Sequence, residues 1–190
     1  MDMKETAAAA VEILRRGGVI LYPTDTVWGI GCDATNEKAV AKVFEINRWS
    51  EAKALVLLAA DLDMVAMYVK EIPSIAIDLV EVNDAPMTII YPQAQYLAPN
   101  AVAEDGSTGI RIPLEGAEFC REVLRRLRKP IVSTSANISG EPAPECWKEI
   151  SEEIKNAVDF CVPPKFDTGT GKASQIIKVG LKGEVEIIRP

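Results

Sequence analysis

The chain has 190 residues, of which 48% are hydrophobic and 26% are charged, a balance typical of a globular domain with a buried core. Its formal net charge of −7 argues against broad, non-specific binding of nucleic acid, which needs many cationic contacts to phosphates. The sequence contains no histidine, which excludes Ser-His-Asp and Cys-His catalysis and most zinc or iron sites.

The first segment, residues 4–16, predicts an amphipathic helix that ends at Gly17-Gly18. Its arginines follow the alanine run, whereas the charge of a secretory signal precedes the apolar run. The longest unbroken apolar run, residues 54–60, is far shorter than the ~18 residues needed to span a bilayer. We therefore expect a cytoplasmic protein that has no membrane partner.

The remaining elements follow from hydrophobic periodicity and from turn residues. Helices are predicted at 37–46, 61–69, 73–82, 116–128 and 145–157. Strands are predicted at 19–22, 54–60, 87–91, 106–113, 130–132, 174–179 and 184–189. Because no repeat or linker separates them, we expect one α/β domain over residues 1–190, with a twisted mixed sheet flanked by helices.

Two glycine-rich stretches resemble nucleotide-binding motifs but lack the required context. GIGCDA (29–34) has dinucleotide-type spacing, yet six loop residues separate it from the preceding strand, so the tight strand-turn-helix geometry is missing. GTGKAS (169–174) places Ala173 where a phosphate loop needs Ser or Thr. The four cysteines contain no C-x-x-C pair, and we expect inert thiols and no metal site.

Two polar loops are stronger candidates for a ligand site. PTDT (23–26) leaves the carboxyl end of a strand, where open α/β sheets bind ligands, although it could equally form an ordinary turn. STSAN (133–137) places three hydroxyls and an amide directly after an apolar strand, which suits a ligand with phosphate, ribose or carboxylate groups. Arg111 alternates with Ile110 and Ile112, so it either faces solvent or binds a carboxylate or phosphate.

The stretch EINRWSEAK (45–53) leaves a predicted helix and carries Arg48, Trp49 and Lys53. It is either a clamp for a phosphorylated ligand or a solvated helix end covered by one aromatic ring. The local residues leave both interpretations open.

PTDTVWGIGCDA, the helix that follows it and STSANISG together resemble the YrdC/Sua5 family of threonylcarbamoyl-AMP synthases. The match runs in order over nearly the whole chain, and the length resembles the short bacterial form. The resemblance implies a twisted α/β sheet around an open cavity. It also implies a nucleotidyltransferase reaction in which L-threonine, bicarbonate and ATP, with Mg²⁺, give threonylcarbamoyl-AMP and pyrophosphate.

This product leads to N6-threonylcarbamoyladenosine in tRNA. The implied partners are the three substrates, downstream threonylcarbamoyl-transfer proteins and, more weakly, tRNA or double-stranded RNA. Such chemistry needs no histidine, because it depends on orientation and on cations that spread phosphate charge.

The resemblance also implies roles for individual residues. Arg48, Lys53 and Arg111 would be catalytic. The threonine site would use Thr24, Arg111, Ser133 and Ser174, and the nucleotide site would use Asn47, Arg48, Lys53, Ser107, Ser135, Asn137 and Arg189. The positions of Ser174 and Arg189 depend on short matching strings.

The chain departs from the family pattern at the expected triphosphate clamp. Where the family carries Lys-x-Arg, this sequence has Asn47, Arg48 and Trp49, and only Lys53 matches a downstream lysine. Each lost charge-assisted phosphate contact weakens binding by roughly ten- to a hundredfold.

Two alternatives therefore stand beside the synthase. One is a catalytically weakened relative that binds nucleotide or RNA. The other is a carbamoyl-transfer module of the hydrogenase-maturation kind, which normally lies within a much longer chain.

Overall fold

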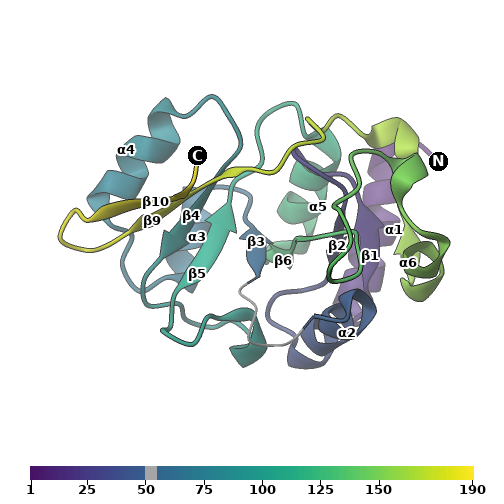
Figure 1. Ribbon diagram of the computed structural model, residues 1–190, viewed down its shortest axis with the longest axis horizontal. Helices are drawn as coiled ribbons and strands as arrows, with labels where there is room; N and C mark the ends of the chain where they lie inside the picture. The colour runs from purple at the N-terminus through teal and green to yellow at the C-terminus, as the bar shows by residue number, and fades with distance from the viewer. Residues whose placement is uncertain (50–54) are drawn as a thin grey trace.

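The computed structural model describes residues 1–49 and 55–190 (Figure 1). Its α-helices are α1 (Met3–Arg15), α2 (Glu37–Asn47), α3 (Leu62–Tyr68), α4 (Ser74–Val82), α5 (Glu118–Leu127) and α6 (Glu152–Ala157). Its strands are β1 (Ile20–Tyr22), β2 (Gly29–Gly31), β3 (Val56–Leu58), β4 (Met87–Tyr91), β5 (Thr108–Arg111), β6 (Ile131–Val132), β7 (Thr134–Ser135), β8 (Phe160–Cys161), β9 (Gln175–Val179) and β10 (Val185–Arg189). Three 3₁₀ turns are η1 (Pro99–Ala101), η2 (Trp147–Glu149) and η3 (Pro164–Phe166).

The strands form two sheets. The six-stranded sheet has the order β10-β9-β4-β5-β3-β6, and the four-stranded sheet has the order β7-β2-β1-β8. Both are mixed: β4 is antiparallel to β5 and parallel to β9, while β1 is antiparallel to β2 and parallel to β8. The predicted mixed α/β fold is confirmed, although its strands divide between two sheets.

The chain passes from one sheet to the other at Ser133, the single residue between β6 and β7. The Ser133 amide donates to the carbonyl of Val56 in β3, at 2.8 Å, and β7 pairs with β2. The polar loop predicted after the strand at 130–132 is thus a short strand in a second sheet. The backbone of this stretch hydrogen-bonds to β3 and β2, and its side-chain hydroxyls project from that backbone.

Helix starts follow from capping residues that the sequence displays. Asp2 and Glu5 form a reciprocal capping box at α1, with the Glu5 amide 2.8 Å from Asp2 Oδ1. Asn36 accepts from the Ala39 amide, at 3.0 Å, at the start of α2. The predicted helix at 145–157 is wrong in its first part, where η2 precedes α6, and Ser151 caps α6 instead.

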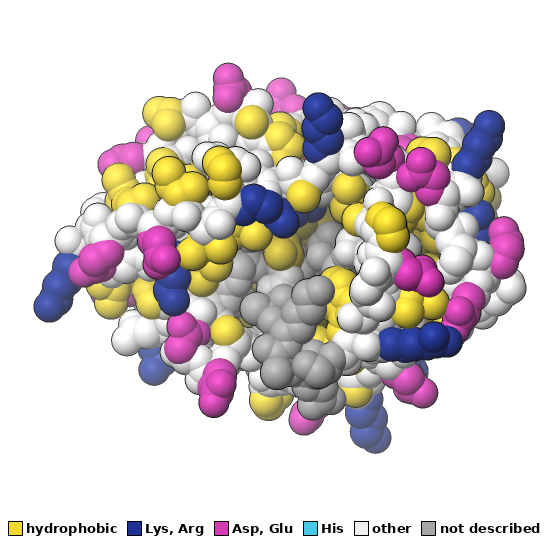
Figure 2. Space-filling view, viewed as in Figure 1, with side chains coloured by type: hydrophobic (Ala, Val, Ile, Leu, Met, Phe, Trp, Pro, Cys, Tyr) yellow, Lys and Arg dark blue, Asp and Glu magenta, His cyan; other side chains and the backbone are white. Residues whose placement is uncertain are grey.

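Helices α1 and α5 lie side by side against the four-stranded sheet (Figure 1). The core includes fully buried Tyr22, Leu57 and Ile110 from the two sheets and Trp28 from the loop before β2. None of the helices in residues 1–49 and 55–190 is long and apolar enough to cross a bilayer. Acidic and basic side chains are interspersed on the face shown in Figure 2, and they form no continuous basic patch on that face.

Candidate functional site

A cavity of about 410 Å³ lies where the two sheets meet. Its walls come from the loop between β1 and β2, from β3 and β5, from residues 133–135 and from the segments around 143–145 and 171–176. This volume falls within the roughly 300–1,000 Å³ range of small-molecule sites. The polar loops predicted from sequence therefore border one cavity, although they are about a hundred residues apart.

Arg111 is the most deeply buried cation of the cavity, with 4% of its surface exposed. Its Nε donates to Asp25 Oδ1 at 2.9 Å, and its Nη2 donates to Thr26 Oγ1 at 3.1 Å. Asp25 is 5% exposed, so the pair is buried on both sides. Of the two alternatives for Arg111, exposure to solvent is wrong: the guanidinium is fixed by the PTDT loop.

The PTDT loop is itself held by hydroxyl contacts. Thr24 Oγ1 donates to the carbonyl of Val27 at 2.7 Å and accepts from the Thr26 amide at 3.0 Å. These bonds form a compact turn, and they also orient Thr26 toward Arg111. Thr24 thus lies two residues before Thr26, the first residue of this loop to line the cavity, and its hydroxyl is already hydrogen-bonded within the loop.

The segment 167–171 presses against the same loop. The amides of Thr170 and Gly171 donate to the carbonyls of Asp25 and Thr26, at 3.2 and 2.9 Å. A Cβ at Gly169 would lie 2.5 Å from the Thr26 carbonyl oxygen, so only glycine fits here without displacement. The GTGK stretch is therefore a backbone clamp on the PTDT loop.

Arg189 brings a second cation to the cavity from β10. Its Nε donates to the Ser174 carbonyl at 2.8 Å, and the Ser174 hydroxyl lies 2.7 Å from the Thr88 hydroxyl. Partial burial and, after it, the nearby charge of Arg111 lower the pKa of Arg189. Two cations that disfavour one another in one cavity are stabilised when an anion binds between them.

Ser133 and Ser135 also line this cavity, as does Thr134 between them. The Thr134 hydroxyl is buried and has no hydrogen-bond partner among the described residues. Asn137 instead uses its amide group locally, donating to the Glu141 carbonyl at 2.9 Å. An unpartnered buried hydroxyl is uncommon, and a polar ligand would satisfy it.

Three other predicted site residues, Asn47, Arg48 and Ser107, do not line this cavity. Asn47 is fully buried and donates to the carbonyls of Ser135 and Asn137, at 3.0 and 2.7 Å, which ties α2 to the STSAN stretch. Arg48 has left-handed backbone geometry and pairs with Glu153 of α6. That ion pair borders a separate cavity of about 490 Å³ between α2 and α6.

Ser107 borders a third, smaller cavity of about 120 Å³, which shares Leu55, Val56 and Ile176 with the main one. Its hydroxyl and amide both donate to Asp105 Oδ1, and these hydrogen bonds lower the pKa of Asp105 to about 2. Lys53 lies outside the described residues.

Several residues of the cavity had no individual role in the sequence-based prediction. Thr26, Trp49 and Glu145 all line it, and Asp25 anchors its arginine. The carboxylate within PTDT was a signal for Asp25, because a buried arginine requires a partner. Glu145 lies beside Gly171, where an added Cβ would be 3.3 Å from the Glu145 carbonyl oxygen, and no local sequence pattern indicates this position.

The arrangement suits a ligand with at least two anionic groups. Arg111 and Arg189 supply positive charge, while the serine and threonine hydroxyls supply hydrogen-bond donors and acceptors at several positions on the cavity wall. The described residues contain no group of three or more His, Cys, Asp or Glu side chains that could hold a metal ion. Cys32 and Cys120 are buried free thiols whose pKa burial raises, so both stay protonated.

Comparison with known proteins gives a consistent result. The sequence model named Sua5/YciO/YrdC, described as telomere recombination, matches residues 12–190. The threonylcarbamoyl-AMP synthase of Hahella chejuensis is 32% identical over 169 residues, which cover 88% of this chain and 90% of the relative.

Two solved structures share the fold. A variant of P. abyssi Sua5 superposes with a TM-score of 0.88 at 24% identity, covering all of this chain and 57% of that one. P. abyssi Sua5 complexed with L-threonine superposes with a TM-score of 0.78 at 23% identity, covering 94% of this chain and 52% of that one. This chain thus spans little more than half of the P. abyssi chains.

Proposed function

The chain belongs to the Sua5/YciO/YrdC family, and from this premise we propose that it is a threonylcarbamoyl-AMP synthase. The proposed reaction first joins the amine of L-threonine to bicarbonate with loss of water, which gives a carbamate. It then transfers the adenylyl group of ATP to that carbamate and releases pyrophosphate. Support comes from relatives with that name that match most of this chain. The single observation that carries the proposal is the cavity in which Arg111 and Arg189 lie beside serine and threonine hydroxyls.

We assign Arg111 to a carboxylate of the threonine or of its carbamate. Its Nε and Nη2 are already bonded to Asp25 and Thr26, while no described residue accepts from its Nη1. A guanidinium that is fixed on one side can orient an anion on the other without losing further side-chain freedom. The PTDT loop therefore acts on substrate through Arg111.

We assign Arg189 and the hydroxyl of Ser135 to the phosphates of ATP, and we keep Ser133 and Ser174 with the threonine. The lowered pKa of Arg189 supports this role, because a nearby anion would relieve its repulsion with Arg111. Positioning and charge stabilisation account for most of the catalysis in phosphoryl transfer. The carbamate oxygen then attacks the α-phosphorus, and pyrophosphate leaves.

We propose that Mg²⁺ enters as the complex with ATP. Mg²⁺ is usually held by substrate phosphates and one or two carboxylates, and there it neutralises phosphate charge. Glu145 lines the cavity and is the exposed carboxylate that could serve.

The test is incubation of the full chain with ATP, Mg²⁺, threonine and bicarbonate. We expect pyrophosphate release that depends on threonine, and a product with the mass of threonylcarbamoyl-AMP. Arg111→Met should lower kcat/KM for threonine at least about a hundredfold, since it removes a fixed cation from the reacting groups. Arg16→Met is the matched control, because Arg16 is an exposed arginine on α1. Absence of threonine-dependent release would refute the proposal.

A second candidate is a relative that binds nucleotide with little turnover. Asn47 has a structural role in tying α2 to β7, and Arg48 pairs with Glu153 away from the main cavity, so both are poor substitutes for a Lys-x-Arg clamp. Calorimetric titration with ATP separates the two candidates. Tight binding without turnover would favour the second one. RNA is the less favoured ligand, given the net charge of −7.

A further inference from the structure

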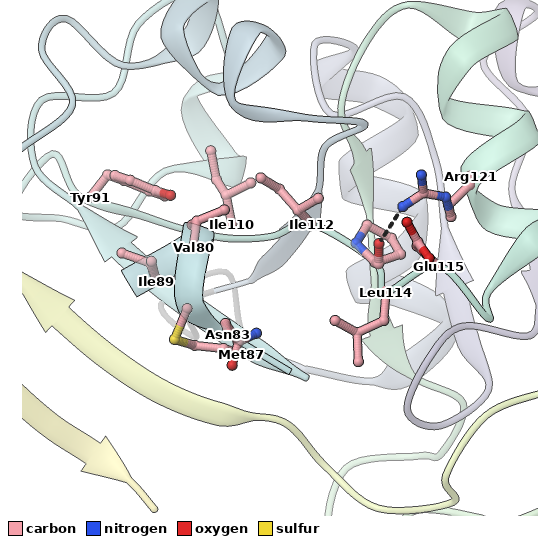
Figure 3. A pocket seen from close by; sticks show the side chains of 11 residues that line it. Val80, Asn83, Met87, Ile89, Tyr91, Ile110, Ile112, Leu114, Glu115 and Arg121 are labelled. Atoms are coloured by element: carbon pink, nitrogen blue, oxygen red, sulfur yellow. Dashed lines mark hydrogen bonds between the residues drawn. The ribbon is translucent and has the colours of Figure 1, made fainter. Parts of the chain in front are cut away.

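A separate cavity of about 170 Å³ lies on the other face of the strands that carry the candidate site. Its apolar wall includes Met87 and Ile89 of β4 and Ile110 of β5, with Val80 of α4 opposite them (Figure 3). We call it the rear cavity.

Alternation along the strands separates the rear cavity from the candidate site. On β4, Met87, Ile89 and Tyr91 line the rear cavity, while Thr88 and Ile90 face the opposite side. On β5, Ile110 faces the rear cavity and Arg111 faces the candidate site. The sheet therefore lies between the two cavities, and a molecule bound in one does not occupy the other.

At one end of the rear cavity lies the Tyr91 hydroxyl, which has no hydrogen-bond partner among the described residues. Tyr91 is 1% exposed, and no hydrogen bond joins its hydroxyl to any residue of the described chain. The side chain points along the cavity from one end (Figure 3). Burial raises the pKa of Tyr91, so the hydroxyl remains a donor at neutral pH. Tyr91 Oη is not one of the fully buried polar atoms that lack a partner in the described chain, so it reaches the open space of the cavity and can donate to a molecule bound there.

The opposite end of the rear cavity carries one cationic and one anionic side chain. Arg121 of α5 donates from Nη1 to the carbonyl of Pro113 at 3.1 Å, as the dashed line in Figure 3 shows. Glu115 lies beside it and carries the opposite charge. The neighbouring cation and anion balance one another, so a ligand needs no net charge to fit.

From these features we propose that the rear cavity binds a small, uncharged, largely apolar molecule that offers one hydrogen-bond acceptor to Tyr91. The volume limits its size, because an apolar cavity of about 150 Å³ holds benzene. A six-membered cyclic ketone has this size and chemistry. Its ring would contact Met87, Ile89 and Ile110, and its carbonyl oxygen would accept from the Tyr91 hydroxyl.

The experiment compares two probes of the same shape, cyclohexanone and methylenecyclohexane, of which the first alone carries an acceptor oxygen. Each is titrated into the full chain while the methyl resonances of Met87, Ile89 and Ile110 are followed by NMR. We expect saturable shifts with cyclohexanone and weaker binding of the hydrocarbon. Tyr91→Phe, which removes one oxygen atom, should weaken cyclohexanone binding by roughly two- to tenfold and leave the hydrocarbon unchanged.

Val80→Phe provides the second control, since its ring would fill the cavity from α4, and it should weaken both probes at least tenfold by the loss of space. If thermal unfolding shows that Val80→Phe is not folded, Leu114→Phe replaces it, because its ring would fill the cavity from the opposite wall. The proposal is overturned if no saturable shift occurs. It is equally overturned if both probes respond identically to Tyr91→Phe, as a water bound to the hydroxyl would predict. Neither probe requires ATP or threonine, so the result is independent of the proposed function.

Discussion

Breaking the buried pair between Asp25 and Arg111 should destabilise the fold more than breaking an exposed ion pair. The side chains are 4% and 5% exposed, so Asp25→Asn leaves a positive charge in the protein interior with Thr26 as its remaining described partner. Removal of one member of a buried pair typically costs about 3–5 kcal/mol. Because Arg111 keeps its hydrogen bond to Thr26, we expect a loss of stability near the lower limit of this range.

We therefore expect Asp25→Asn to lower the free energy of unfolding by about 3 kcal/mol. For a chain of this size, that corresponds to a decrease of roughly 6–12 °C in the melting temperature. The assay is urea unfolding followed by circular dichroism, at pH 7 and without ligand. Glu12→Gln is the matched control, because it breaks an exposed pair with Arg16 and should change stability by less than about 1 kcal/mol.

The double variant Asp25→Asn/Arg111→Met tests whether the loss comes from the pair itself. Replacement of both members by uncharged groups removes the unpaired charge, so the double variant should lose less than the sum of the single variants, by about 1–3 kcal/mol. Strict additivity would refute the reasoning. So would a loss for Asp25→Asn no larger than that for Glu12→Gln.

Three further predictions concern the surroundings of the site. Arg48→Ala should change the KM for ATP less than about threefold, because Arg48 pairs with Glu153, whereas Arg189→Ala should raise it roughly tenfold or more in a pyrophosphate-release assay. Asp105 has a pKa lowered to about 2, so it stabilises the fold above its unfolded pKa and loses this effect as the pH falls toward 2. The melting temperatures of Asp105→Asn and of the parent should therefore converge between about pH 4 and pH 2, and a constant difference would contradict this. Gly169→Ala should lower stability by about 1–3 kcal/mol in urea unfolding, because its Cβ meets backbone oxygens, while Gly116→Ala, with open space around it, should change little.

Much of the fold could be predicted from local patterns. The strand at 87–91 coincides with β4, and the helices at 4–16 and 37–46 agree with α1 and α2 to within one residue at each end. These segments combine clear periodicity with capping residues that the chain itself supplies, such as Asn36. Short strands were missed: β2 and β8 have three and two residues, too few to produce a period.

The candidate site was predictable in part. PTDT, STSAN and Arg111 were identified because hydroxyl, amide and guanidinium groups at strand ends can bind anionic ligands. The role of Asp25 as the partner of Arg111 depends on a contact between residues 86 positions apart. The direction of Arg48 was equally hidden, because the choice between a phosphate and Glu153 depends on where α6 packs.

The sequence by itself determined the element types, the absence of histidine chemistry and the two polar loops, because these depend on residue identity and short-range periodicity. The tertiary structure decided which of those polar groups share a cavity. The crossing at Ser133 joins the two sheets, and the backbone clamp at Gly169 fixes the PTDT loop. Alternation along β4 and β5 then places Arg111 on one face and Ile110 on the other, which divides the candidate site from the rear cavity.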